Sequence, residues 1–155
     1  MSTVMTLRIK STSSAETENL AERLGSKLRG GEVIELVSDL GGGKTTFTRG
    51  LVRGTGSTDR VASPTFTLSR EYSAPHFTVA HFDFYRLAEA GIVADELAEF
   101  IGDPAYVCVV EWGDGVQDVL PKDRLTVRIV QKGEDMRDIV LGYTPEISYL
   151  VEELV

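Results

Sequence analysis

Three consecutive glycines, Gly41 to Gly43, stand immediately before Lys44 and Thr45. A β-branched run over residues 32–37 precedes them, and an amphipathic segment from Lys44 to Gly54 follows, so the pattern indicates strand, loop and helix. Glycines allow backbone angles that a Cβ would forbid, and successive N–H groups can then converge on phosphate oxygens at the helix N-terminus. The stretch therefore predicts a phosphate-binding loop in an α/β fold.

The side chains that follow the glycines are typical of triphosphate chemistry. Lys44 can reach the terminal phosphates as a compact charge, and the hydroxyl of Thr45 has the position of a Mg²⁺ ligand. Ser38 occupies the place of the first glycine in the pattern G-x-x-x-x-G-K-[ST]. Because glycine there permits an unusual backbone or a close approach, the serine leaves open a module that binds nucleotide without hydrolysing it.

Size and composition indicate one globular domain over residues 1–155. The chain has 155 residues, of which 42% are apolar and 26% charged, enough for a core without disulfide or metal support. The single cysteine, Cys108, lies in the apolar run YVCVV, so we expect it to be buried. No run approaches the roughly 18 apolar residues of a membrane span, so we expect a soluble, cytoplasmic protein.

Charge is distributed unevenly along the chain. The net charge of −8 argues against indiscriminate binding to duplex nucleic acid, which depends on clustered cations. From Lys44 to Arg86 there are six basic and three acidic side chains, whereas Leu87 to Val155 has five basic and fifteen acidic ones. The basic part could hold a polyanion and the acidic part a basic partner, or the acidic surface could simply maintain solubility.

Periodicity predicts the remaining elements. Ser13 and Glu16 have the spacing of a capping box, which begins a helix that Gly30 and Gly31 end. Strands are expected over residues 5–10, 65–72, 77–85, 105–111, 124–130 and 136–143, and further helices over 94–102 and 145–155. We interpret this order as a three-layer α/β sandwich with a largely parallel central sheet, an antiparallel edge hairpin and helices on both faces.

Two acids follow runs that should be interior strands. Glu111 ends the run VCVV and Asp83 ends VAHF, and a carboxylate emerging from a buried strand is costly unless it is paired or binds metal. Either could hold Mg²⁺, and Asp83 could instead position the attacking water. His81 shares a strand face with Asp83, but without a second histidine at metal-ligand spacing we favour a packing role for it. Thr65 follows Pro64 in a loop, where it could sense the γ-phosphate or be an ordinary extended residue.

Taken together, the segments SDLGGGKTTFTRGL, SPTFTL, HFDFYRL and VVEWGDGVQDVLPKDRLTV resemble the TsaE family, small bacterial P-loop ATPases of tRNA threonylcarbamoyladenosine biosynthesis. The resemblance covers roughly Ser13 to Val130. It implies that ATP binds at Gly41, Gly42, Gly43, Lys44, Thr45 and Thr46, with Thr17 near the base and Trp112 beside the site. It also implies that Thr45, Glu111 and Asp83 serve Mg²⁺, and that Lys44, Glu111, Asp83 and Thr65 serve hydrolysis.

The resemblance further implies a partner-dependent activity. Family members act with two proteins, of the TsaB and TsaD type, that transfer threonylcarbamoyl to an adenosine beside the tRNA anticodon, so tRNA would be met indirectly. A small P-loop kinase is an alternative, although the chain offers no segment long enough for a substrate lid. A GTPase is disfavoured because QKGED lacks the N-K-x-D pattern of guanine selection.

Overall fold

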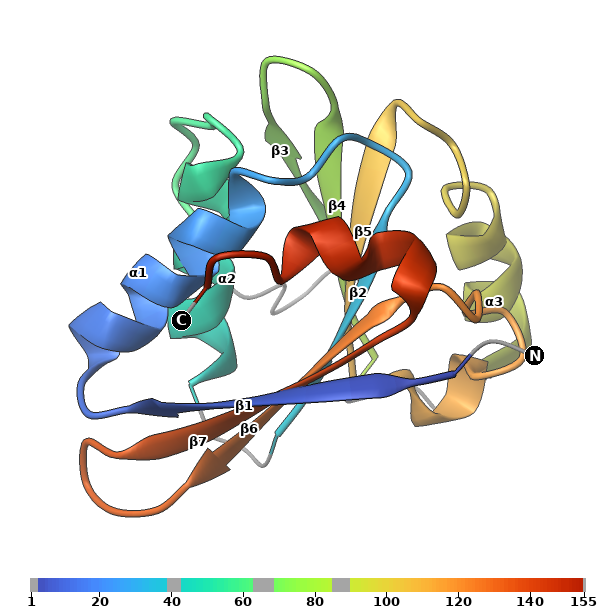
Figure 1. Ribbon diagram of the computed structural model, residues 1–155. Helices are drawn as coiled ribbons and strands as arrows, with labels where there is room; N and C mark the ends of the chain where they lie inside the picture. The colour runs from blue at the N-terminus through green and yellow to red at the C-terminus, as the bar shows by residue number, and fades with distance from the viewer. Residues whose placement is uncertain (1–2, 39–42, 63–68, 85–89, 155) are drawn as a thin grey trace.

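The computed structural model describes residues 3–38, 43–62, 69–84 and 90–154, in which seven strands form one sheet (Figure 1). In chain order the elements are β1 (Met5–Ser11), α1 (Ser14–Gly25), β2 (Val33–Val37), α2 (Lys44–Gly54), β3 (Ser69–Ser73), β4 (Thr78–Asp83), α3 (Ala90–Ala98), β5 (Tyr106–Glu111), the 3-10 helix η1 (Gly113–Val116), β6 (Leu125–Gln131), β7 (Arg137–Tyr143) and the 3-10 helix η2 (Pro145–Leu150).

The sheet is parallel in its centre and antiparallel at both sides. Its order is β1-β7-β6-β2-β5-β4-β3. Strands β6, β2, β5 and β4 pair in parallel, whereas β3, β7 and β1 each join their neighbours antiparallel. The expected hairpin of β6 and β7 is present, but β1 pairs with the outer side of β7 and so takes the edge of the sheet itself.

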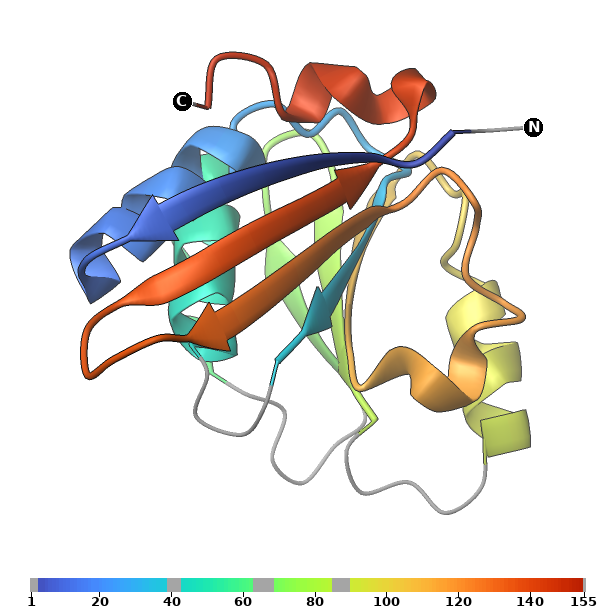
Figure 2. The ribbon, with the colours of Figure 1, turned by 60° about the horizontal axis from the view of Figure 1, so that its bottom comes forward.

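Helical segments cover both faces of the sheet, which confirms the three-layer prediction. Helices α1 and α2 lie on one face together with η2, and α3 and η1 lie on the other (Figures 1 and 2). Alternation along the strands divides the core accordingly. In β4, for example, Val79 packs on the side of α1 and α2, while Ala80 and Phe82 pack on the side of α3.

Helices α1 and α2 pack in backbone contact because glycines face backbone carbonyls. A Cβ added at Gly50 would lie 2.1 Å from the carbonyl oxygen of Glu18, and one added at Gly54 would lie 2.1 Å from that of Glu22. The paired residues advance together along both helices, so the helices run in the same direction. The N-termini of α1 and α2 therefore lie at the same end of the layer.

The first helix begins as predicted but ends earlier. The Ser13 hydroxyl accepts the backbone N–H of Glu16 at 3.1 Å, which caps α1. The Glu16 carboxylate in turn accepts from the N–H and hydroxyl of Thr12, one residue before the partner that a capping box would use. Helix α1 ends at Gly25 instead of continuing to Gly30, and Leu28 remains buried in the turn that follows.

The C-terminal segment differs from its prediction as a helix over residues 145–155. A 3-10 helix covers only Pro145–Leu150, and Ile147 has non-helical angles of φ −114° and ψ 17°. Ile147, Leu150 and Leu154 are all buried, so packing on the sheet determines the path of this segment. The Tyr149 hydroxyl also donates to Glu32 at 2.7 Å, which fixes the segment to the loop before β2.

The third helix and the β3 strand are also displaced from their predictions. Helix α3 spans Ala90–Ala98, earlier than the expected 94–102. Strand β3 begins at Ser69, and positions 65–68 of the expected strand lie outside the described residues. Within the described ranges, no helix has the length and apolar character that crossing a bilayer requires.

We expect Gly50→Ala to destabilise the protein by about 2 kcal/mol, because overpacking against a backbone carbonyl outweighs the helix propensity that alanine gains. The free energy of unfolding from urea titration measures this. Gly133→Ala is the matched control, because the added Cβ would meet its nearest atom at 3.8 Å. Equal stability of the two variants would contradict the helix contact.

Alkaline pH should weaken the fold partly through Tyr149. Burial, with the hydrogen bond to Glu32, raises the pKa of Tyr149 from 10.0 to about 12. The folded state then holds a proton that the unfolded state releases, so stability present below pH 10 is lost as the pH rises towards 12. In urea unfolding at pH 9 and pH 11, Tyr149→Phe should lose less stability than the unchanged chain. An identical loss in both would show that this hydroxyl is not involved.

Candidate functional site

The carboxyl ends of the parallel strands bring the candidate residues to one edge of the sheet. Glu111 at the end of β5 pairs in register with Leu36 of β2 on one side and with Asp83 of β4 on the other. Ser38 follows β2 directly, and α2 begins at Lys44. Ligands in open α/β sheets bind outside the carboxyl ends of the strands, so this is the edge where a ligand is expected.

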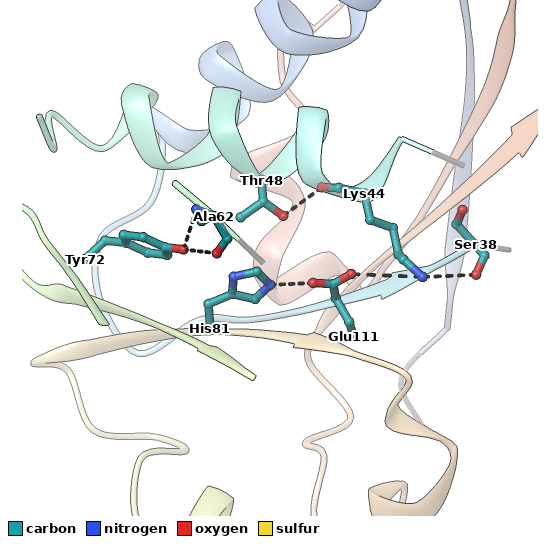
Figure 3. Close-up of polar contacts among 7 residues, drawn as sticks. All are labelled: Ser38, Lys44, Thr48, Ala62, Tyr72, His81 and Glu111. Carbon is teal, nitrogen blue, oxygen red and sulfur yellow. Dashed lines mark hydrogen bonds and ion pairs between the residues drawn. The ribbon is translucent and has the colours of Figure 1, made fainter. Parts of the chain in front are cut away.

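The ammonium group of Lys44 is nearly buried among three groups of this edge. The residue is 8% exposed. Its Nζ donates to the Ser38 carbonyl at 3.3 Å and lies 4.0 Å from Oε1 of Glu111 (Figure 3). The same Nζ lies 4.0 Å from the centroid of the Trp112 ring, a cation–π distance. The lysine thus points along the strand ends instead of into solvent.

The start of α2 has the backbone geometry that the glycine run predicts. Gly43 is the N-cap residue, with φ 103° and ψ 15°, which a side chain would strain. It offers no capping side chain, and Thr45 and Thr46 follow half-buried in the first turn. Gly41 and Gly42, which the sequence assigns to the same loop, lie outside the described residues.

Glu111 is held by a histidine that sequence analysis assigned to packing. Glu111 is 3% exposed and His81 is 1% exposed. His81 Nε2 lies 2.5 Å from Oε2 of Glu111. Two features of the sequence could have indicated this contact. Alternation places His81 on the same strand face as Asp83, and a buried acid ends another strand. A buried carboxylate needs a donor, and this histidine supplies one.

The residue after Glu111 has an unusual backbone. Trp112 adopts φ 57° and ψ 49°, a left-handed conformation that is rare for a bulky residue. This turn ends β5 and leads into η1, with the indole ring against the Lys44 ammonium. Backbone strain of this kind occurs at functional sites, where the surroundings hold it in place.

Of the two remaining candidates, Asp83 is described by the structure and Thr65 is not. Asp83 ends β4, is half-buried and lies across from Glu111 in register, so both acids reach the same edge. Thr65 lies outside the described residues. The backbone just before that segment is anchored, because the buried Tyr72 hydroxyl donates to the Ala62 carbonyl at 2.8 Å and accepts its N–H at 3.3 Å. Burial raises the pKa of Tyr72.

Thr17 lies beside the start of α2, as the parallel helix pair requires. It is buried, and its hydroxyl lies 2.6 Å from that of Ser11. A small hollow of about 30 Å³ joins three segments here: the start of α1, the start of α2 and the β6–β7 turn. Its lining residues are Ser13, Ser14, Thr17, Gly43, Thr46, Asp135 and Arg137.

A second cavity, about 210 Å³ in volume, lies beside Ser38 and Trp112. Glu35 lines it and is a buried acid that sequence reasoning missed. Its carboxylate accepts from Arg124 Nε at 3.0 Å and from Gln117 Nε2 at 2.7 Å. These contacts neutralise the Glu35 carboxylate and join β2 to the segment before β6, so we assign Glu35 a structural role.

The donor set at the strand ends fits Mg²⁺ better than a closed metal centre. Among the described residues there is no group of three or more His, Cys, Asp or Glu side chains arranged for a metal. Mg²⁺ is usually bound by one or two carboxylates together with phosphates and water. Glu111, Asp83 and the hydroxyl of Thr45 offer oxygen donors of that kind.

A parallel β2, a glycine-led turn into α2 and an acid at the end of the neighbouring parallel strand define the P-loop NTPase-like class of α/β folds. Comparison with known proteins narrows the class. The sequence model of the family described as "Threonylcarbamoyl adenosine biosynthesis protein TsaE" matches residues 11–139. The chain belongs to the TsaE family.

Individual relatives agree with this assignment. The Bacillus subtilis tRNA threonylcarbamoyladenosine biosynthesis protein TsaE is 36% identical over 138 residues, 86% of this chain and 83% of that protein. The Haemophilus influenzae protein of the same name is 40% identical over 114 residues, 70% and 68% of the two chains. The crystal structure of Bacillus subtilis YdiB superposes with a TM-score of 0.80 at 35% identity, covering 98% of this chain and 95% of that one.

The cation–π contact predicts a fluorescence change. Trp112 is the only tryptophan of the chain, and a protonated amine against the ring quenches its emission by donating a proton to the excited indole. Lys44→Met should therefore raise the emission intensity of the folded, ligand-free protein. Lys132→Met, an exposed lysine of the β6–β7 turn, is the matched control. Equal intensities in all three proteins would contradict the contact.

Proposed function

We propose that this protein is the ATP-binding and ATP-hydrolysing component of the tRNA threonylcarbamoyladenosine (adenosine 37) modification system. It would act in the cytoplasm with partners of the TsaB and TsaD type and meet tRNA only through them. The observation that carries the proposal is the buried ammonium of Lys44 beside Glu111, where a glycine-led loop enters α2. Membership of the TsaE family supports the choice of pathway.

Lys44 would supply the main positive charge for the terminal phosphates. In the structure its ammonium contacts the Ser38 carbonyl, the Glu111 carboxylate and the Trp112 ring. None of these is a short, fully formed ion pair, since the Glu111 oxygen lies 4.0 Å away. A phosphate oxygen offers a stronger, charge-assisted contact and would replace the weaker ones.

Thr45, Glu111 and Asp83 would hold Mg²⁺ on the phosphates. When bound, the ion would neutralise charge that develops on the transferred phosphoryl group. The two acids differ in burial, and this suggests different roles. Glu111 is enclosed and fixed by His81, so it would serve as a rigid ligand, whereas the half-buried Asp83 would both contact the ion and orient the attacking water.

The two arginines of α2 support low activity in the absence of partners, while Arg86, another candidate arginine, lies outside the described residues. Arg49 lies 3.4 Å from Glu18 of α1, and Arg53 lies 2.8 Å from Glu22. Both side chains thus join the two helices and point away from the strand ends. A P-loop enzyme without an arginine at the transferred phosphate is slow until a partner supplies stabilising charge.

Hydrolysis with partners present tests the proposal. Lys44→Ala and Glu111→Ala should each lower ATP turnover roughly 100-fold, because each removes stabilisation of charge at the reacting phosphate. Lys122→Ala, an exposed lysine distant from the strand ends, is the matched control and should retain turnover.

Three results would contradict the proposal. ATP binding with no turnover, even with partners, would favour a nucleotide-dependent binding module, which Ser38 in the loop allows. Phosphate transfer to a small molecule would favour a kinase. Retention of threonylcarbamoyladenosine in the tRNA of a deletion strain with no second family member would contradict the pathway.

A further inference from the structure

The two oxygens of the Glu111 carboxylate face different partners (Figure 3). Oε2 lies 2.5 Å from His81 Nε2, within a strong hydrogen bond. Oε1 faces Lys44 Nζ at 4.0 Å, beyond hydrogen-bond distance. The acid is therefore bonded closely to the histidine and only loosely to the lysine.

The histidine is suited to hold the acid in a fixed position. Its ring is buried, and its Nδ1 has no hydrogen-bond partner within the described part of the chain. Because Nε2 faces a carboxylate, it is the nitrogen that carries the proton and donates. The backbone of His81 is paired with Arg70 of β3 on one side and Val109 of β5 on the other, so ring and strand are both constrained.

Release of Glu111 from His81 would let the carboxylate move closer to the Lys44 ammonium. Both charges are almost buried, so their attraction is weakly screened. A carboxylate free to rotate would close the 4.0 Å separation and form a direct ion pair with the ammonium. That pair would occupy the donors that an incoming phosphate needs.

We propose that His81 is a positioning residue that holds Glu111 back from Lys44, so that a direct ion pair between the two does not compete with a triphosphate for the ammonium. The inference rests on the proposed function, because it assigns Lys44 to phosphate binding. It adds a role for His81 that is made entirely through Glu111.

A double-mutant comparison separates this role from simple packing. The measurement is ATP affinity by calorimetry in EDTA, where Lys44 is the main charge on the phosphates. We expect His81→Phe to weaken binding about tenfold, since a buried charge pair must then be broken. In a Glu111→Gln background the same change should have no effect, because the neutral amide does not capture the ammonium. His81→Gln, which retains a donor, should restore most of the affinity.

Phe82→Leu is the matched control, since Phe82 is equally buried on the opposite face of β4 and should not weaken binding in either background. Equal weakening by His81→Phe with and without Glu111 would overturn the inference, as would no weakening at all. If His81→Phe does not fold, His81→Asn replaces it, because its shorter amide cannot reach the acid.

Failure of the proposed function would look different, since neither the unchanged chain nor Glu111→Gln would bind ATP. The ligand-free Trp112 emission then decides the inference. His81→Phe should draw Lys44 from the indole and raise the emission, and it should do so only while Glu111 is intact. Unchanged emission would overturn the inference.

Discussion

The burial of one carboxylate governs the arrangement of the strand ends. Glu111 is removed from water at the carboxyl end of β5, in the parallel part of the sheet, where an unpaired charge would cost several kcal/mol. Two residues offset this cost, His81 of β4 and Lys44 at the start of α2, which face the two carboxylate oxygens. The start of α2, the neighbouring strand β4 and the left-handed Trp112 bring these groups together.

Much of the fold could be read from local patterns. The glycine run indicated the order β2, loop and α2. Alternation identified β4 and the β6–β7 hairpin, and a continuous valine-rich run identified β5, each to within two residues. The outer position of β1 was not predictable, because pairing of distant strands leaves no local signal. The prediction of a C-terminal helix was wrong for a related reason. The apolar spacing suits a helix, but packing on the sheet interrupts the helical backbone at Ile147.

The places of three candidate residues in the fold could be predicted, but their contacts could not. Sequence placed Lys44, Asp83 and Glu111 correctly at the ends of elements, since each follows or precedes a recognisable run. It could not show that His81 bonds Glu111, because that contact joins two strands 30 positions apart. Nor could it show the lysine against Trp112, which depends on a positive φ that no spacing reveals.

The glycine contacts between α1 and α2 have a mechanical meaning as well. A carbonyl seated directly against a glycine leaves no flexible side chain between the helices that could absorb a shift. A tilt of α2 would therefore shift α1 as well. The two helices would then behave as one rigid unit on this face of the sheet.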